Sequence, residues 1–204
     1  MRFEDCSSLE ECISSKRDEL KKALSDLGKK LDDECESELL VPVIPGDLYC
    51  GHRPLRHHPV FGRENKGRSL PPHAASAVFD WASRIKQFGI RGIICLLSPR
   101  ELAHYAGLAL GAANLIEFYE NQGFAVLPIP WDDPRHRCVS EWSFQKELVQ
   151  KREVALGAFD ALDKPILLHC SAGIDRSSPV AAYIFVKRSA HYRSPDEARP
   201  QSVY

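Results

Sequence analysis

Short apolar runs alternate with helical patterns over residues 73–189, and this alternation restricts the fold more than any other feature of the chain. The runs are continuous, as in Ile-Ile-Cys-Leu-Leu at residues 93–97, which is typical of strands buried on both faces of a parallel sheet. Strands are predicted at residues 90–97, 124–129 and 166–169, a pair of short strands within residues 41–50, and helices at residues 73–88, 115–122, 140–162 and 178–189. Strands that alternate with helices predict an α/β fold, with a mostly parallel central sheet and helices on both faces.

The N-terminal segment, residues 1–40, differs in composition from the rest of the chain. It is rich in Glu, Lys, Asp and Leu and contains no Pro. Leucines recur there at three- and four-residue spacing, the pattern of an amphipathic helix: Leu20, Leu24, Leu27 and Leu31. We therefore predict an N-terminal helical extension over residues 1–40 and a main domain over residues 41–204. The extension either packs on the main domain, which we favour, or binds a partner.

Composition excludes several classes of protein. The length of 204 residues suits one compact domain, and the net charge of −1 argues against a surface built to bind nucleic acid or a membrane. No apolar run approaches the roughly 20 residues that span a bilayer, and the acidic N-terminus is not a secretory signal. The seven cysteines form no CxxC pair, which predicts neither a disulfide framework nor a zinc site and favours a cytoplasmic location.

The segment from residue 166 to residue 179 contains the residues with the clearest chemistry. A predicted buried strand ends at His169, a loop follows from Cys170, and a helix begins near Arg176. The N–H groups and dipole at such a helix start attract an anion and stabilise a thiolate on Cys170. Arg176 can bind two oxygens of that anion with its planar guanidinium, and Gly173 allows the loop to turn tightly. The alternative is that Cys170 is only a buried cysteine.

The pattern His-Cys-x-x-Gly-x-x-Arg-Ser at residues 169–177 resembles the phosphate-binding loop of the protein tyrosine phosphatase superfamily, and of its dual-specificity members in particular. The resemblance implies that Cys170 is the nucleophile and that Ser177 helps the thiolate to leave. His169 would orient the loop and support the thiolate. The implied phosphate-binding residues are Ser171, Ala172, Gly173, Ile174, Asp175 and Arg176. Many family members have Gly in place of Asp175, which here either tunes the arginine or, as we favour, holds the loop by hydrogen bonding.

An upstream aspartate is the second element that this family requires. Trp131-Asp132-Asp133 is similar to the Trp-Pro-Asp loop of tyrosine phosphatases, with Asp132 in the place of Pro. This alignment implies that Asp133 is the general acid, which protonates the leaving oxygen and later accepts a proton from water. Asp132 is the rival for that role. The alternative is that both aspartates only begin a turn before Pro134.

Residues 46–54 and 88–97 also resemble the opening hairpin and the next helix-to-strand passage of dual-specificity phosphatases. Together these resemblances cover roughly residues 43–190 and imply a cysteine-dependent phosphatase that needs no metal or cofactor. The expected substrate is phosphotyrosine in a protein or peptide, with phosphoserine and phosphothreonine as further substrates. A phosphoinositide or inositol-phosphate phosphatase is the alternative within the same chemistry. An alternative of another class is a weakly active phosphate-binding interaction module, because the segment after residue 194 is shorter than the family pattern. Neither nucleic-acid binding nor stable membrane insertion is expected.

Two features outside these motifs also lead to expectations. Residues 52–68 are rich in Arg, His and Lys, and form either a substrate-recognition loop or a solvated loop. Trp81 and Trp142 fall on predicted helices and are expected in the core.

Overall fold

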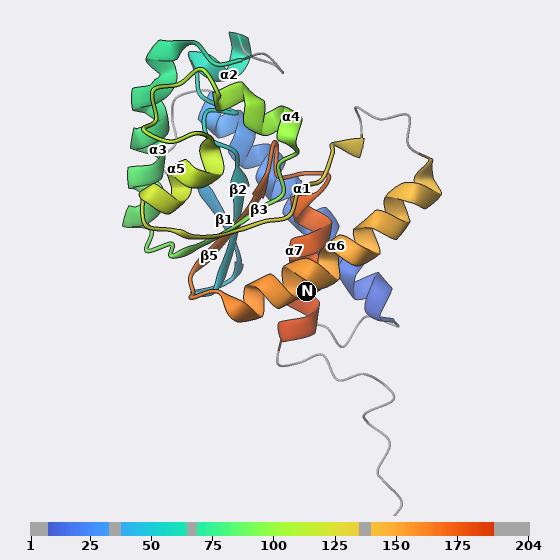
Figure 1. Cartoon of the computed structure of the whole chain (residues 1–204). Helices are drawn as coiled ribbons and strands as arrows, with labels where there is room; N and C mark the ends of the chain where they lie inside the picture. The colour runs from blue at the N-terminus through green and yellow to red at the C-terminus, as the bar shows by residue number, and fades with distance from the viewer. Residues whose placement is uncertain (1–7, 33–37, 65–68, 135–139, 190–204) are drawn as a thin grey trace, which may run out of the picture.

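A central five-stranded sheet organises the chain. The computed structural model describes residues 8–32, 38–64, 69–134 and 140–189 (Figure 1). The strands lie in the order β1-β2-β5-β3-β4, with bounds β1 Leu40–Ile44, β2 Leu48–His52, β3 Gly92–Cys95, β4 Ala125–Pro128 and β5 Ile166–Cys170. Only the β1–β2 pair is antiparallel, and β2, β5, β3 and β4 run parallel. The predicted α/β class and mostly parallel sheet are confirmed.

The carboxyl ends of the four parallel strands meet at one edge of the sheet. Strand β5 is central and every one of its residues is buried, as the apolar run Ile-Leu-Leu at its start predicts. In sheets of this kind, ligands bind beyond the carboxyl ends of the strands, near the point where the chain crosses over. Cys170 ends β5 and lies between the ends of β2 and β3, and therefore occupies this edge.

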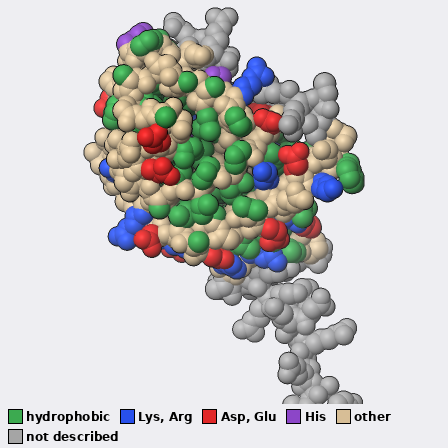
Figure 2. Space-filling view, viewed as in Figure 1, with side chains coloured by type: hydrophobic (Ala, Val, Ile, Leu, Met, Phe, Trp, Pro, Cys, Tyr) green, Lys and Arg blue, Asp and Glu red, His purple; other side chains and the backbone are tan. Residues whose placement is uncertain are grey.

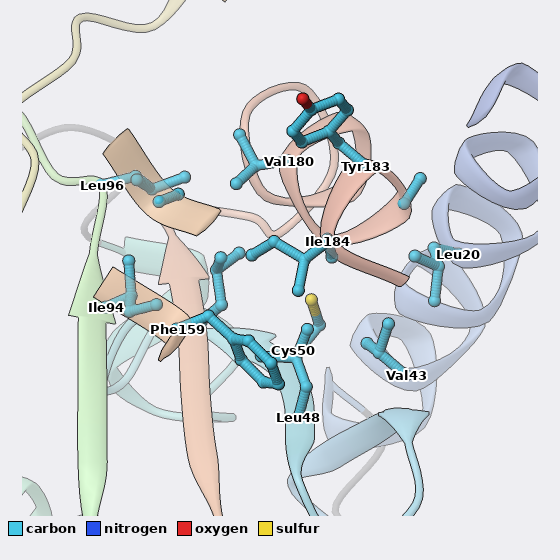
Figure 3. Close-up of a cluster of buried hydrophobic side chains, with 14 of the residues drawn as sticks. Leu20, Val43, Leu48, Cys50, Ile94, Leu96, Phe159, Val180, Tyr183 and Ile184 are labelled. Carbon is cyan, nitrogen blue, oxygen red and sulfur yellow. The ribbon is translucent and has the colours of Figure 1, made fainter. Parts of the chain in front are cut away.

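Helices cover both faces of the sheet (Figure 1). Helices α3 (Ala75–Gln87) and α5 (Leu115–Asn121) cover one face, and α1 (Leu9–Asp32), α6 (Glu141–Ala161) and α7 (Ser177–Arg188) lie on the other. Side chains from α1, α7 and the sheet share one buried cluster, shown in Figure 3, whose members include Leu20, Val43, Leu48, Cys50, Val180 and Ile184. The N-terminal helix thus packs on the main domain, as we favoured.

The element boundaries follow local chemistry. Ser140 accepts a hydrogen bond from the Ser143 N–H and caps α6. Gly123, at a φ of 86°, follows the end of α5. The short helices that the sequence did not predict are α2 (Phe61–Glu64), η2 (Pro72–Ala74), α4 (Pro99–Leu102) and η3 (Ala103–Tyr105).

One of the two tryptophans expected in the core lies on the surface. Trp81 is buried, but Trp142 is 73% exposed at the start of α6, where Lys146 lies over its ring. The prediction that Trp142 belongs to the core was therefore wrong. On the face seen in Figure 2, hydrophobic side chains gather in the middle and charged side chains lie around them.

Two further observations complete the fold. None of the helices in the described ranges is long and apolar enough to cross a membrane. The segment after residue 194, which motivated the interaction-module alternative, lies outside the described residues, as do residues 65–68 of the basic stretch.

Candidate active site

The loop between β5 and α7 folds back against the start of α7. Gly173 has a φ of 70°, and a Cβ atom there would lie 3.1 Å from the carbonyl oxygen of Gly51. Only glycine fits this conformation and this close approach without strain. The Ser178 N–H and hydroxyl both donate to the Gly173 carbonyl, at 3.2 and 3.1 Å, and the same hydroxyl also donates to Ile174. The loop is therefore held in one shape by its own helix.

Cys170 and Arg176, at the two ends of this loop, are both buried. Their residues are 2% and 1% exposed. Burial lowers the pKa of the Arg176 guanidinium, but hydrogen bonding to Glu101 and the charges of the Glu101 and Asp133 carboxylates outweigh it, so the pKa lies above its usual value. Arg176 therefore stays charged.

Hydrogen bonds from three segments fix the orientation of the Arg176 guanidinium. Nη1 donates to the carbonyls of Leu96 and Trp131, at 3.0 and 2.6 Å, and to Glu101 Oε2 at 2.7 Å. Nη2 donates to Glu101 Oε1 at 2.6 Å, which completes a two-pronged pair. Nε is buried and has no hydrogen-bond partner among the described residues. The arginine therefore presents one unsatisfied donor from a rigid side chain.

Glu101 is the site residue that the sequence analysis missed. Burial raises the pKa of this carboxyl, but the hydrogen bonds and charge of Arg176 outweigh burial, so the pKa lies below its usual value. Its Oε2 also accepts from the Ser98 N–H at 2.9 Å, within a capping box that starts α4. In the sequence, Ser-Pro-Arg-Glu at residues 98–101 directly follows a predicted buried strand, and this pattern predicts a capped helical turn. It does not predict which arginine the glutamate binds.

The upstream aspartates occupy different positions. Asp133 is 7% exposed, and its Oδ2 lies 3.7 Å from Arg176 Nη2. Asp132 is only half-buried. The ring of Trp131 stacks on Phe144 of α6, with 5.4 Å between centroids and 12° between planes. Together with the hydrogen bond from Arg176 to the Trp131 carbonyl, this stacking holds the aspartate loop against the Cys170 loop.

His169 is enclosed and has a partner on each ring nitrogen. Burial lowers its pKa to about 4, so the ring is neutral at pH 7. Nδ1 lies 3.2 Å from the Cys170 carbonyl, which can only accept, so Nδ1 carries the proton and donates. Nε2 then accepts from the Tyr119 hydroxyl at 3.3 Å. His169 thus orients the backbone of Cys170 through a fixed tautomer.

Ser177, at the first position of α7, is fully buried. Its hydroxyl has no hydrogen-bond partner among the described residues. A buried hydroxyl normally has a partner, so one that lacks it beside a candidate active-site loop is an available donor.

A second arginine, Arg53, reaches the loop from the end of β2. Its backbone N–H donates to the Ser171 carbonyl at 3.1 Å, and its Nε donates to the Ser171 hydroxyl at 3.2 Å. Its Nη1 donates to the Tyr105 hydroxyl at 2.9 Å, and that hydroxyl donates to the Pro54 carbonyl at 2.6 Å. The sequence analysis placed Arg53 in a basic stretch but did not predict its contact with the loop.

The structure thus brings Cys170, Arg176, Asp133, His169 and Ser177 to one edge of the sheet. The described residues contain no group of three or more His, Cys, Asp or Glu side chains that could hold a metal ion. No protein family model, curated protein or solved structure matches this chain.

Proposed function

We propose that the protein hydrolyses phosphate monoesters through a cysteinyl-phosphate intermediate on Cys170. The observation that supports this most directly is the state of Arg176. Its terminal nitrogens are held by Glu101 and two carbonyls, while its Nε remains a buried donor without a partner in the described residues. An unsatisfied buried donor on a charged group costs free energy, and an oxyanion beside Cys170 would satisfy it.

In the first step, the Cys170 thiolate attacks phosphorus, and the bond from phosphorus to the leaving oxygen breaks. Asp133 transfers its proton to that oxygen, so the product leaves as a neutral alcohol or phenol. Arg176 Nε and the N–H groups of residues 171–176 bind the equatorial phosphate oxygens, where negative charge lies in the transition state. Glu101 keeps the guanidinium in place throughout the reaction.

In the second step, water attacks phosphorus and the phosphorus–sulfur bond breaks. Asp133, now a carboxylate, accepts the proton of that water, and inorganic phosphate is released. Ser177 donates a hydrogen bond to the departing thiolate, which uses the hydroxyl that has no other partner in the described residues. We assign both proton transfers to Asp133 rather than Asp132 on position: Asp133 is the more buried of the two, and its Oδ2, 3.7 Å from Arg176 Nη2, lies beside the proposed phosphate site.

Phosphotyrosine in a protein or peptide is the substrate class that we propose. Cys170 is only 2% exposed, so the phosphorus atom must enter a recess to reach the sulfur. A phosphate at the tip of a tyrosine ring extends farther from the peptide backbone than one on serine or threonine. The resemblance of residues 169–177 to tyrosine phosphatases favours the same substrate.

Turnover of three substrates by matched variants tests this function. The substrates are para-nitrophenyl phosphate, a phosphotyrosine peptide and a phosphoinositide. Cys170→Ser should abolish turnover and keep affinity for phosphate, whereas Cys12→Ser, at another buried cysteine, should remain active. Asp133→Asn should lower the rate by about 10²–10⁴ on the phosphotyrosine peptide, and Asp132→Asn should not. Full activity in Cys170→Ser would exclude the covalent mechanism, and the reverse order of the aspartate variants would assign the acid to Asp132.

A further inference from the structure

A cavity of about 430 Å³ lies beside the candidate active site. The end of α1, the loop that follows β2, and helix α3 form its walls. Its volume falls within the range of small-molecule sites, roughly 300–1,000 Å³. Leu31, Leu39, Leu55 and Trp81 supply apolar surface. Leu55 has a φ of 61°, a left-handed conformation that is strained for a leucine and is most often found at functional sites.

The charged side chains that line this cavity are mainly cationic. The lining includes three arginines, Arg53, Arg56 and Arg84, and one carboxylate, that of Asp80, while Asp32 binds His57 of the same wall. Since the whole chain has a net charge of −1, this concentration of positive charge is local. A small cavity with apolar walls and this charge fits an organic dianion.

Arg53 contributes a buried charge that is not neutralised by a carboxylate. The residue is 5% exposed, and its side-chain partners are the hydroxyls of Ser171 and Tyr105. Among the described residues, no Asp or Glu forms an ion pair with it. Buried arginines are normally paired with an anion, because hydroxyls compensate only part of the lost hydration. An anion in the cavity would supply the missing charge.

His52 is a second buried polar group at the cavity. It lines the cavity and is 5% exposed, and its ring nitrogens lie near the backbone of Ala172 and Leu24 without reaching full hydrogen-bond geometry. Its ring meets that of His57 edge to face, with 4.3 Å between centroids. His57 in turn lies against Gly28 of α1, where an added Cβ would come within 2.8 Å of the His57 ring. The glycine allows the helix to approach and close the cavity wall.

We propose that this cavity binds a small organic phosphate with an apolar body, at a site separate from the Cys170 loop. The phosphate oxygens would accept from Arg53 and His52, and the apolar body would lie against Trp81 and Leu55. Arg53 also binds Ser171 of the Cys170 loop, so an anion in the cavity contacts the candidate active site through one side chain. The proposal does not require Cys170 to be catalytic.

Titration with phenylphosphonate, followed by NMR, tests the proposal on the full chain. This compound cannot be hydrolysed as an ester, because its phosphorus is bonded to carbon. Of the three tryptophan indole signals, Trp131 reports the aspartate loop and the exposed Trp142 reports neither site. Trp81 lines the cavity, but its ring also lies 6.4 Å from that of His169, so its shifts are assigned to the cavity by the variants below. We expect saturable shifts of the Trp81 signal. If the proposed phosphatase function also holds, the Trp131 signal shifts with its own dissociation constant. If the Trp81 signal shifts and the Trp131 signal does not, the result supports the cavity site and contradicts the proposed active site.

Variants of the cavity separate local binding from an indirect effect. Arg84→Gln and His52→Gln should each weaken the Trp81 response about tenfold or more, because the first removes a positive charge from the cavity lining and the second loses a hydrogen bond to a charged ligand. Asp80→Asn should strengthen it, and Arg91→Gln, an exposed arginine just before β3, should leave it unchanged. The Trp131 response should persist in Arg84→Gln. A wild-type Trp81 signal that does not move, or equal affinities in Arg84→Gln and Arg91→Gln, would overturn the proposal.

Discussion

Two buried arginines lie at the Cys170 loop, Arg176 at the end of the loop itself and Arg53 after the neighbouring strand β2, and their partners differ in kind. Arg176 forms a two-pronged pair with Glu101, beyond β3, and lies 3.7 Å from Asp133. Arg53, which follows β2, has only hydroxyl partners for its side chain among the described residues. Carboxylates inside the protein neutralise the charge of Arg176, whereas no carboxylate in the described ranges neutralises the charge of Arg53.

The histidines beside these arginines show the same difference. His169 has a hydrogen-bond partner on each nitrogen, and His52 has none with adequate geometry in the described part of the chain. Both sides keep buried polar groups without a partner in the described residues: Arg176 Nε and the Ser177 hydroxyl on one side, and the His52 ring on the other. What differs is the counter-charge, because a carboxylate holds Arg176 and no carboxylate among the described residues holds Arg53. In the function and the ligand site that we propose, the Arg176 side would perform the chemistry and the Arg53 side would bind an anion.

The largest expected effect comes from removing the carboxylate on the Arg176 side. Glu101→Leu should lower the free energy of unfolding by about 3–5 kcal/mol, because it leaves a buried guanidinium without its main counter-charge. Glu101→Gln keeps one acceptor and should cost less. Urea unfolding of both variants measures the difference. If Glu101→Leu lowers the free energy of unfolding by less than about 1 kcal/mol, as expected for an ion pair at the surface, then Asp133 alone neutralises Arg176.

Acid should destabilise the protein through its two buried histidines. Burial lowers the pKa of His169 to about 4 and that of His52 to about 3, below the unfolded value of about 6.5. As the pH falls below 6.5, the unfolded chain binds protons that the folded chain does not, so stability falls. The loss is about 2 kcal/mol per histidine between pH 6.5 and pH 5, and it ends below each folded pKa.

Urea unfolding at pH 5, 6 and 7 measures this acid dependence. His169→Asn and His52→Asn should each reduce the slope by the contribution of one histidine. A bound anion beside His52 would raise its pKa, so added phenylphosphonate should reduce the slope in wild type but not in His52→Asn. An unaltered slope in both variants would mean that other groups cause the acid loss.

Local sequence patterns predicted one part of this arrangement and could not predict the other. His169, Cys170 and Arg176 lie in one strand–loop–helix segment, where short spacing determines which side chains meet. Glu101 is 75 residues from Arg176, and Ser171 is 118 residues from Arg53, so those pairs depend on strand order and register. Patterns of apolar residues predict strands but not which strands are neighbours. The basic composition of residues 52–68 was recognised in the sequence. The cavity that some of these residues line was not predicted, because it forms only where α1 and α3 pack beside them.

The hydroxyl on the Arg53 side should contribute less than the carboxylate on the Arg176 side. Tyr105→Phe removes an acceptor of Arg53 and the donor to the Pro54 carbonyl. We expect a loss of about 1.5 kcal/mol in the free energy of unfolding, as for a hydrogen bond to a charged group. Phenylphosphonate affinity should rise or stay constant, because Arg53 gains a free donor. A stability loss equal to that of Glu101→Leu would remove the distinction between the two arginines.

The smallest effect is expected at a third arginine, which has the geometry of Arg176 without its burial. Arg188 binds Asp160 through two parallel hydrogen bonds, one of them 2.8 Å from Nε to Oδ1, and the two side chains are 41% and 46% exposed. Water solvates both charges there, so Asp160→Asn should cost about 0.2–1 kcal/mol, and less as salt is added. Unfolding at low and high ionic strength measures this loss beside that of Glu101→Leu. If Asp160→Asn and Glu101→Leu lower the free energy of unfolding equally, pair geometry rather than burial determines the contribution of Glu101. The contrast between Arg176, which has a carboxylate partner, and Arg53, which has none in the described residues, would then have no energetic basis.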